Sequence, residues 1–305
     1  MPLSHLLLAL AVVAVWGTNF VVIKWGLAEL PPFALATLRF ALSALPWVFF
    51  IARPRVAWWR LAAFGVLLGC GQFGLLFQAM RSDISPGLAS LVVQTQVFFT
   101  IGIAMLATRE RVRPLQVLAA SLAVAGMVLI GWAGQARHGT AAADVTPLGL
   151  ALVLCAALSW ALANSVVRGA GKVDALGFMV WSSLFAVLPL AGLSAVVEGV
   201  EPVREAVLRA SPMAWAAVLW QAVGNTLFGY GTWNWLLARH PAATVTPMAL
   251  LVPVFGMGAA AAVLHEALPG WKLAAAALVM GGLALNLLAS RANVPNTSTA
   301  GDKQP

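Results

Sequence analysis

The feature that most limits the fold of this chain is a series of apolar stretches, each about 20 residues long, that recurs along nearly its whole length. About 20 residues is the length at which an α-helix crosses the roughly 30 Å hydrocarbon core of a bilayer. Only 9% of the residues are charged, whereas soluble domains carry about 25%. The sequence therefore predicts an all-α protein that is surrounded by lipid.

Turn signals between the apolar stretches divide the chain into ten predicted transmembrane helices, five in each half. The first half covers residues 3–132 and the second covers 147–289; a polar linker, 133–146, joins them, and a polar tail, 290–305, is predicted to be disordered. A short surface helix is predicted over 201–208. The predicted spans are 3–26, 33–52, 58–80, 86–108, 114–132, 147–167, 175–197, 213–238, 242–264 and 271–289.

Lys and Arg residues are distributed unequally between the two sides of the predicted bundle. If the N-terminus is cytoplasmic, most of them, including Arg53, Arg55 and Arg60, fall on the cytoplasmic side, which is the usual bias of membrane proteins. Both termini are therefore predicted to be cytoplasmic. The net charge of +8 is scattered over short turns rather than gathered in one patch, so no nucleic-acid partner is expected.

The two halves repeat each other. Trp16 and Lys24 recur as Trp160 and Arg168, shifted by 144 positions. A second set recurs with a shared shift of 156 positions, in which Phe99, Gly102, Glu110 and Gly126 correspond to Phe255, Gly258, Glu266 and Gly282. Because each half has an odd number of spans, the copies are expected to face opposite ways. Inverted repeats of this kind allow one half to rock against the other around a central site, which is transporter architecture, although fold alone does not prove function.

Motifs for catalysis, metal binding and ATP binding are missing from the sequence. The four histidines have no metal-ligand spacing, and the turn at 169–172 lacks the Ser or Thr of a phosphate loop because Val173 stands there. A membrane-embedded enzyme would need a convergent acid, base or metal, and a small-molecule sensor would usually add an output domain. We therefore expect no enzymatic activity and no cofactor. No acidic residue lies deep in a span, so the sequence offers no obvious carrier for protons within the membrane. It does not decide whether transport is coupled to protons.

Polar and aromatic side chains inside the predicted spans form the candidate site. A polar group in hydrocarbon needs a partner in place of water, so it is expected to face a cavity or another helix. For each residue alone, interhelical hydrogen bonding is the alternative interpretation. The candidate substrate-binding residues are Trp16, Asn19, Arg39, Gln72, Gln78, Gln94, Gln96, Trp160, Asn164, Gln221, Asn225, Tyr230 and Trp233.

Arg39 is the one basic residue that lies well inside a predicted span rather than within two residues of a span end. Its long side chain can reach back to the membrane surface, and structural anchoring is the favoured interpretation; the alternative is that its planar guanidinium binds a substrate carboxylate. Glu110 and Glu266 precede the last span of each half, where a carboxylate favours the positive end of the helix dipole. We expect both to be structural.

Two pairs of residues suggest a pseudo-symmetric site. Trp16 precedes Asn19 by three positions and Trp160 precedes Asn164 by four, so at helical spacing each pair shares one face. The two pairs are predicted to form opposite walls of a substrate site in the middle of the membrane. Packing of the first helix of each half against its neighbours is the alternative.

The first half opens with VVAVWGTNFVVIKWGL and continues through ELPPFALATLRFALSALP, and both halves have a Glu before a glycine-containing last helix. These patterns together resemble the EamA family of the drug/metabolite transporter superfamily. GLASLVVQTQVFFTI and PMALLVPVFGMGAAAAVLHE are similar to bacterial O-acetylserine/cysteine exporters. The resemblance implies a bacterial inner-membrane protein with ten helices that exports cysteine, O-acetylserine or similar amino acids; other amino acids, aromatic metabolites and drugs are alternative substrates. A single basic residue deep within the spans fits a zwitterionic or neutral small molecule better than a phosphorylated one.

Overall fold

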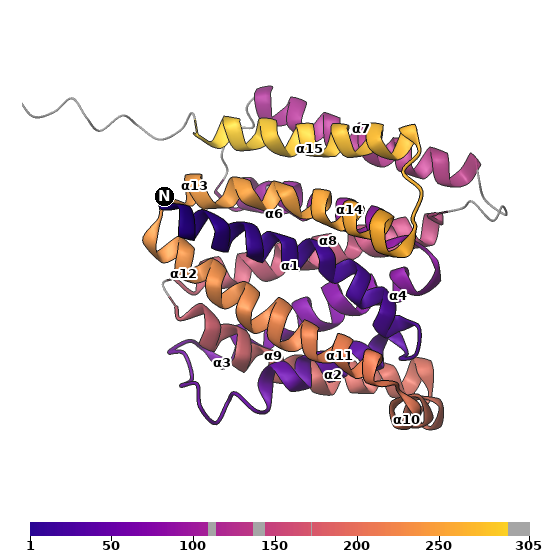
Figure 1. Cartoon of the computed structure of the whole chain (residues 1–305). Helices are drawn as coiled ribbons and strands as arrows, with labels where there is room; N and C mark the ends of the chain where they lie inside the picture. The colour runs from indigo at the N-terminus through magenta and orange to yellow at the C-terminus, as the bar shows by residue number, and fades with distance from the viewer. Residues whose placement is uncertain (109–113, 137–143, 172, 292–305) are drawn as a thin grey trace, which may run out of the picture.

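The computed structural model describes residues 1–108, 114–136, 144–171 and 173–291. Within these ranges the chain is helical, with no β-strand and only an isolated bridge between Ile84 and Val145 (Figure 1). The helices that run without interruption are α1 (Leu3–Leu27), α2 (Pro32–Ala44), α7 (Pro114–Ala136), α8 (Pro147–Gly169), α10 (Val200–Arg209) and α15 (Gly270–Arg291). Eight helical segments in the described part of the chain are long and apolar enough to cross a membrane.

Five other helical segments change their hydrogen-bond pattern along their length. Three contain a π-helical part, and two contain a tighter 3₁₀ part. The segments with a π-helical part are α3 (Trp58–Val66), η1 (Leu67–Gly74) and α4 (Leu75–Ser82); α9 (Ala175–Leu193) and η3 (Ser194–Glu198); and α11 (Pro212–Leu219), η4 (Trp220–Tyr230) and α12 (Gly231–Arg239). The segments with a 3₁₀ part are α5 (Pro86–Val92), η2 (Val93–Thr95) and α6 (Gln96–Thr108); and α13 (Ala242–Val245), η5 (Thr246–Leu251) and α14 (Val252–Leu264).

The second predicted span, 33–52, is shorter in the structure, because α2 ends at Ala44. Pro46 has no N–H to donate to the Leu42 carbonyl, and proline inside a helix clashes with the turn before it. The Trp47 indole takes the place of the missing donor, with Nε1 lying 3.1 Å from the Leu42 carbonyl oxygen. The chain then continues in irregular turns as far as Phe50.

The predicted span at 213–238 is also absent from the eight apolar helices. It forms the continuous α11, η4 and α12, but the polar side chains of Gln221, Asn225 and Thr226 interrupt its apolar character. The predicted surface helix at 201–208 is present as α10, none of whose side chains is buried. The first residues of the predicted linker belong to α7, which runs to Ala136, and the tail beyond residue 291 lies outside the described residues.

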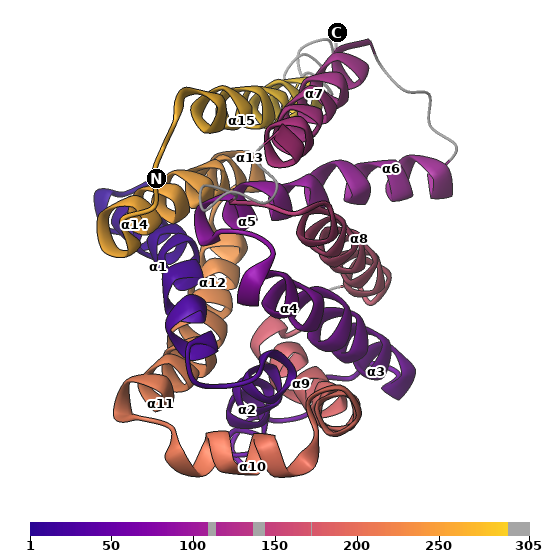
Figure 2. The same ribbon diagram turned by 90° about the vertical axis from the view of Figure 1, so that its right-hand side faces the viewer.

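The helices α7 and α15 pack along each other at one side of the bundle (Figures 1 and 2). Gly126 and Gly282 allow this close approach. A Cβ at Gly126 would lie 2.7 Å from Val279 Cγ2, and a Cβ at Gly282 would lie 2.5 Å from the Ala119 carbonyl oxygen. The two glycines that repeat at 156 positions therefore face the same interface from opposite sides.

Carboxylates hold the helix ends together at the end of the bundle opposite the N-terminus, which we call the carboxylate-capped end and define by Glu29, Glu198 and Glu266. Glu198 accepts hydrogen bonds from the Phe33 and Ala34 N–H groups of α2, at 2.7 and 3.0 Å. Glu29 accepts from Ser211, which precedes α11, through side chain and backbone, and these hydrogen bonds lower the pKa of the Glu29 carboxyl. Anionic groups favour helix N-termini because the first N–H groups of a helix have no partner within it.

Glu266 has a structural role, but at a different helix from the one expected. It accepts from the Gly87 N–H at the start of α5, at 3.0 Å, and from Ser85 Oγ at 2.6 Å. It also pairs with Lys272 of α15 at 2.8 Å. Glu266 thus connects the start of α5 in the first half to the start of α15 in the second. Its counterpart in the repeat, Glu110, lies outside the described residues.

Candidate functional site

Arg39 lies between the two long π-helical segments η1 and η4. A π-helix is a wide, locally strained form of the helix that occurs often at functional sites. The guanidinium carbon of Arg39 lies 3.5 Å from the ring centroid of Phe73 in η1. On its other side, Nη1 and Nη2 donate to Gln221 Oε1 at 3.4 Å and to Thr226 Oγ1 at 3.3 Å, both in η4. The side chain of Arg39 therefore bridges one π-helical segment from each predicted half.

The environment of Arg39 compensates its charge only in part. The residue is 1% exposed, so its side chain does not reach back to the membrane surface. None of the ion pairs among the described residues involves it. Its two hydrogen bonds are longer than the roughly 2.7–3.2 Å that is usual for N–H···O bonds, and Nε makes none. A buried cation held only by neutral groups can accept a carboxylate partner.

An aromatic cluster adjoins this position on α1, η4 and α12. The indole N–H of Trp16 donates to the Asn225 carbonyl oxygen at 3.2 Å. The ring of Trp16 also lies 5.4 Å from that of Tyr230 and 5.2 Å from that of Trp233, between centroids. Asn19 lies one turn further along α1 and is buried. Trp16, Asn225, Tyr230 and Trp233 are thus joined in one cluster.

The remaining glutamine candidates divide between different helices. Gln72 is buried in η1, next to Phe73, while Gln78 is half-buried on α4. Gln94 Nε2 donates to the Ala249 carbonyl oxygen of η5 at 3.4 Å. Gln72 is therefore adjacent in sequence to Phe73, which contacts Arg39, and Gln94 links η2 to η5.

A second polar cluster lies between α6 and α8. Asn164 Nδ2 donates to Gln96 Oε1 at 3.1 Å, and the Thr100 hydroxyl donates to the same oxygen at 3.3 Å. Trp160, one turn before Asn164, packs against the apolar core. The predicted walls of the site thus have different partners, because Trp16 contacts η4 whereas Asn164 contacts α6.

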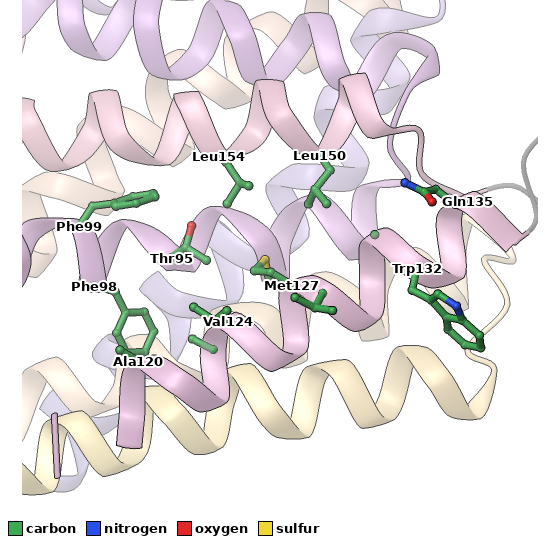
Figure 3. A pocket seen from close by; sticks show the side chains of 13 residues that line it. Thr95, Phe98, Phe99, Ala120, Val124, Met127, Trp132, Gln135, Leu150 and Leu154 are labelled. Carbon is green, nitrogen blue, oxygen red and sulfur yellow. The ribbon is translucent and has the colours of Figure 1, made fainter. Parts of the chain in front are cut away.

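An apolar groove of about 630 Å³ runs between α6, α7 and α8 and contains none of the candidate residues (Figure 3). Its lining includes Phe98, Met127 and Leu154, and Trp132 at one end is 68% exposed. These side chains belong to helices long and apolar enough to span a membrane. The groove is therefore lined by side chains of these apolar helices and by neither Arg39 nor the residues that contact it.

Two side chains that contact Arg39, Phe73 and Thr226, were not among the predicted site residues. Each is adjacent in sequence to a predicted one, Gln72 and Asn225 respectively. An aromatic ring or hydroxyl in an apolar span is common in helix packing, so it gave no signal of its own. Their contacts with Arg39 in the folded protein are what identify Phe73 and Thr226 as site residues.

Comparison with known proteins places these features in a family. The model of the EamA-like transporter family matches residues 3–132 and 147–288. A "Probable amino-acid metabolite efflux pump" of Salmonella typhimurium is 39% identical over 93% of this chain and 95% of its own length, and a protein of the same name from Escherichia coli is 37% identical over the same shares.

Two further likenesses are more distant. A "Probable terminal-alkyne amino-acid exporter" of Streptantibioticus cattleyicolor is 26% identical over 93% of this chain and 94% of its own length. A solved crystal structure shares the fold with a TM-score of 0.62 at 21% identity, covering 96% of this chain and 100% of that one. The family match spans both halves, and the relatives are matched over nearly their full lengths. The chain therefore belongs to the EamA-like transporter family.

Proposed function

We propose that this protein exports small amino-acid metabolites across the bacterial inner membrane by alternating access. The observation that carries the proposal is the burial of the Arg39 guanidinium between η1 and η4, without a carboxylate partner among the residues that the structure describes. A cation in this position suits the carboxylate of an amino acid. Family membership and the names of the two most similar relatives reported above support the same substrate class.

The proposed mechanism uses ten transmembrane helices arranged as two inverted five-helix repeats. Irregular segments occur at equivalent places in the two halves and support the repeat: η1 and η4 lie in the third predicted spans, and η2 and η5 in the fourth. Gly126 and Gly282 occupy equivalent places in the fifth. Rocking of one repeat against the other would expose Arg39 to each side in turn. Opening at the carboxylate-capped end requires Glu266 or Glu198 to separate from the helix that it caps.

The proposed orientation places both termini in the cytoplasm and the carboxylate-capped end in the periplasm. A reporter that is active only in the cytoplasm should work when fused at Arg55 or after residue 291, and should be inactive when fused at Glu205 of α10. A periplasmic reporter should give the reverse pattern. Cytoplasmic activity at Glu205 would contradict the inverted arrangement.

Cysteine, O-acetylserine or a similar zwitterionic or neutral solute is the proposed cargo. Liposomes containing the purified protein and loaded with labelled cysteine, O-acetylserine or an aromatic amino acid should lose at least one label several-fold faster than protein-free liposomes. Cells that overproduce the protein should also release more of the same compound. If no amino acid leaves faster than from protein-free liposomes, the proposal is wrong, and export of drugs or a sensing role becomes the better interpretation.

A further inference from the structure

The loop that joins α2 to α3 carries exposed aromatic side chains at the end of the bundle where the N-terminus lies (Figure 1). α2 begins at the carboxylate-capped end, and its 13 residues cover only about 20 Å at 1.5 Å per residue. The turns after Ala44 therefore lie within the remaining depth of the roughly 30 Å hydrocarbon core. Phe49 and Phe50 belong to these turns and are 82% and 83% exposed. Their rings thus face acyl chains near the edge of the core.

Two arginines follow the phenylalanines and project from the loop. Arg53 and Arg55 are exposed, whereas Pro54 between them is buried. The guanidinium carbon of Arg53 lies 4.0 Å from the centroid of the Trp58 ring, and its Nη2 donates to the Val56 carbonyl oxygen at 3.3 Å. A guanidinium has five N–H donors, and this hydrogen bond uses one of them. The loop thus presents two cations just beyond the phenylalanines.

Contacts with α9 hold this loop in place. Trp181 Nε1 donates to the Ile51 carbonyl oxygen at 2.9 Å, and the Trp181 ring meets that of Trp58 edge-on, with 6.2 Å between centroids. Trp58 and Trp59 at the start of α3 are 48% and 62% exposed, and tryptophan favours the membrane–water interface. The exposed side chains of this anchored loop form what we call the loop patch, which consists of Phe49, Phe50, Arg53, Arg55, Trp58 and Trp59.

The loop patch lies in a basic region of the protein. The sequence has no Asp or Glu between Glu29 and Asp83. A Cβ at Gly169, the last residue of α8, would lie 3.4 Å from Arg60 Nη1, so Arg168 adds a charge close to Arg60. None of the ion pairs among the described residues includes any of these arginines. The positive charge of the region is therefore left for a partner from outside the described chain.

Asp174 is a carboxylate close to the loop, but it serves a different purpose. It accepts from the Leu176 and Gly177 N–H groups at 3.2 and 3.0 Å and so caps the start of α9. A Cβ at Gly177 would lie 3.2 Å from the Ala52 carbonyl oxygen, which places this helix start against the loop. Because the unpaired N–H groups of α9 already attract the carboxylate, Asp174 leaves the arginines of the loop patch without an ion pair.

We propose that the loop patch binds an anionic phospholipid, with Arg53 and Arg55 on the phosphate of its headgroup and Phe49 and Phe50 among its acyl chains. Arginine suits phosphate because its planar fork donates to two oxygens at once, and basic residues at the membrane surface attract anionic lipids. An acidic soluble partner would match the arginines but not two phenylalanines at the depth of the hydrocarbon. The proposal does not depend on which compound the protein exports.

Lipid binding is measured by the thermal unfolding midpoint of the full-length protein in detergent, because a ligand of the folded state raises that midpoint. Phosphatidylglycerol should raise it at lower concentrations than phosphatidylcholine with the same acyl chains. The double variant Arg53→Gln with Arg55→Gln should need about 30-fold more phosphatidylglycerol for the same shift, since each basic residue contributes about fivefold. Its response to phosphatidylcholine should be unchanged. In 1 M NaCl, where charges are screened beyond about 3 Å, the wild-type preference for phosphatidylglycerol should fall strongly.

The matched control is the double variant Arg204→Gln with Arg209→Gln on α10. These arginines are also exposed, but each lies within 4 Å of a glutamate, at 2.9 and 3.9 Å, and the variant should respond to both lipids as the wild type does. Glycerol 3-phosphate, which has a phosphate but no acyl chain, should not raise the midpoint at the same concentrations. Equal shifts with both lipids, an unchanged preference in the Arg53→Gln and Arg55→Gln variant, or equal stabilisation by glycerol 3-phosphate would each overturn the proposal.

Discussion

Replacing Lys272 with methionine is expected to lower the free energy of unfolding by about 3–5 kcal/mol, since removal of one partner from a buried ion pair leaves the other charge uncompensated. Lys272 is 0% exposed and its Nζ lies 2.8 Å from Glu266 and 3.0 Å from Asp144. The same ammonium donates to the Ala267 carbonyl oxygen at 3.0 Å. Its loss would also weaken the position of Glu266 at the start of α5. Equilibrium unfolding by denaturant in detergent, which gives both the free energy and the midpoint of unfolding, measures the effect.

Two control variants test whether burial is the cause. Lys272→Arg retains the charge and should be less destabilised than Lys272→Met. Arg204→Ala removes the partner of Glu201 in an exposed pair, with side chains 65% and 66% exposed, and should change stability by no more than about 1 kcal/mol. An unfolding midpoint of Lys272→Met equal to that of the wild type would show that the pair does not stabilise this end of the bundle.

Replacing Arg39 with methionine is expected to abolish export and leave the fold at least as stable as before. Arg39 is as buried as Lys272, but it has no carboxylate partner among the described residues, so an apolar side chain removes a desolvated charge without exposing another. Arg39→Lys keeps the charge but loses the planar fork and the stacking on Phe73. We expect that variant to retain about 1% of wild-type export, corresponding to a loss of one charge-assisted pair of hydrogen bonds.

The efflux rate from liposomes and the unfolding midpoint in detergent must be measured on the same preparations. Reduced efflux with an unchanged or higher midpoint supports substrate binding by Arg39. Normal efflux by a folded Arg39→Lys protein would remove Arg39 from the site. A strong fall of the midpoint in both variants would instead support the structural anchoring that was favoured from the sequence.

The positions of the helices follow largely from local sequence. Apolar length and turn residues predicted the eight long apolar helices to within a few residues, because each must satisfy its backbone hydrogen bonds internally in lipid. The surface helix α10 followed from its amphipathic composition. The family was also recognisable from motifs. Pro46 was visible in the sequence, and the early end of α2 could have been inferred from it.

The grouping of the candidate residues depended on tertiary packing. Arg39 and Gln221 are 182 positions apart, and no periodicity within one helix indicates which face of another helix it meets. The same limit explains why Glu266 was assigned to the start of α15, next to it in sequence, rather than to Gly87 of α5. Sequence alone thus determined which segments are helices in lipid and which polar residues they carry. Only the packing of the helices decided that Arg39 meets η1 and η4 while Asn164 meets α6, because those contacts depend on the relative rotation and depth of whole helices.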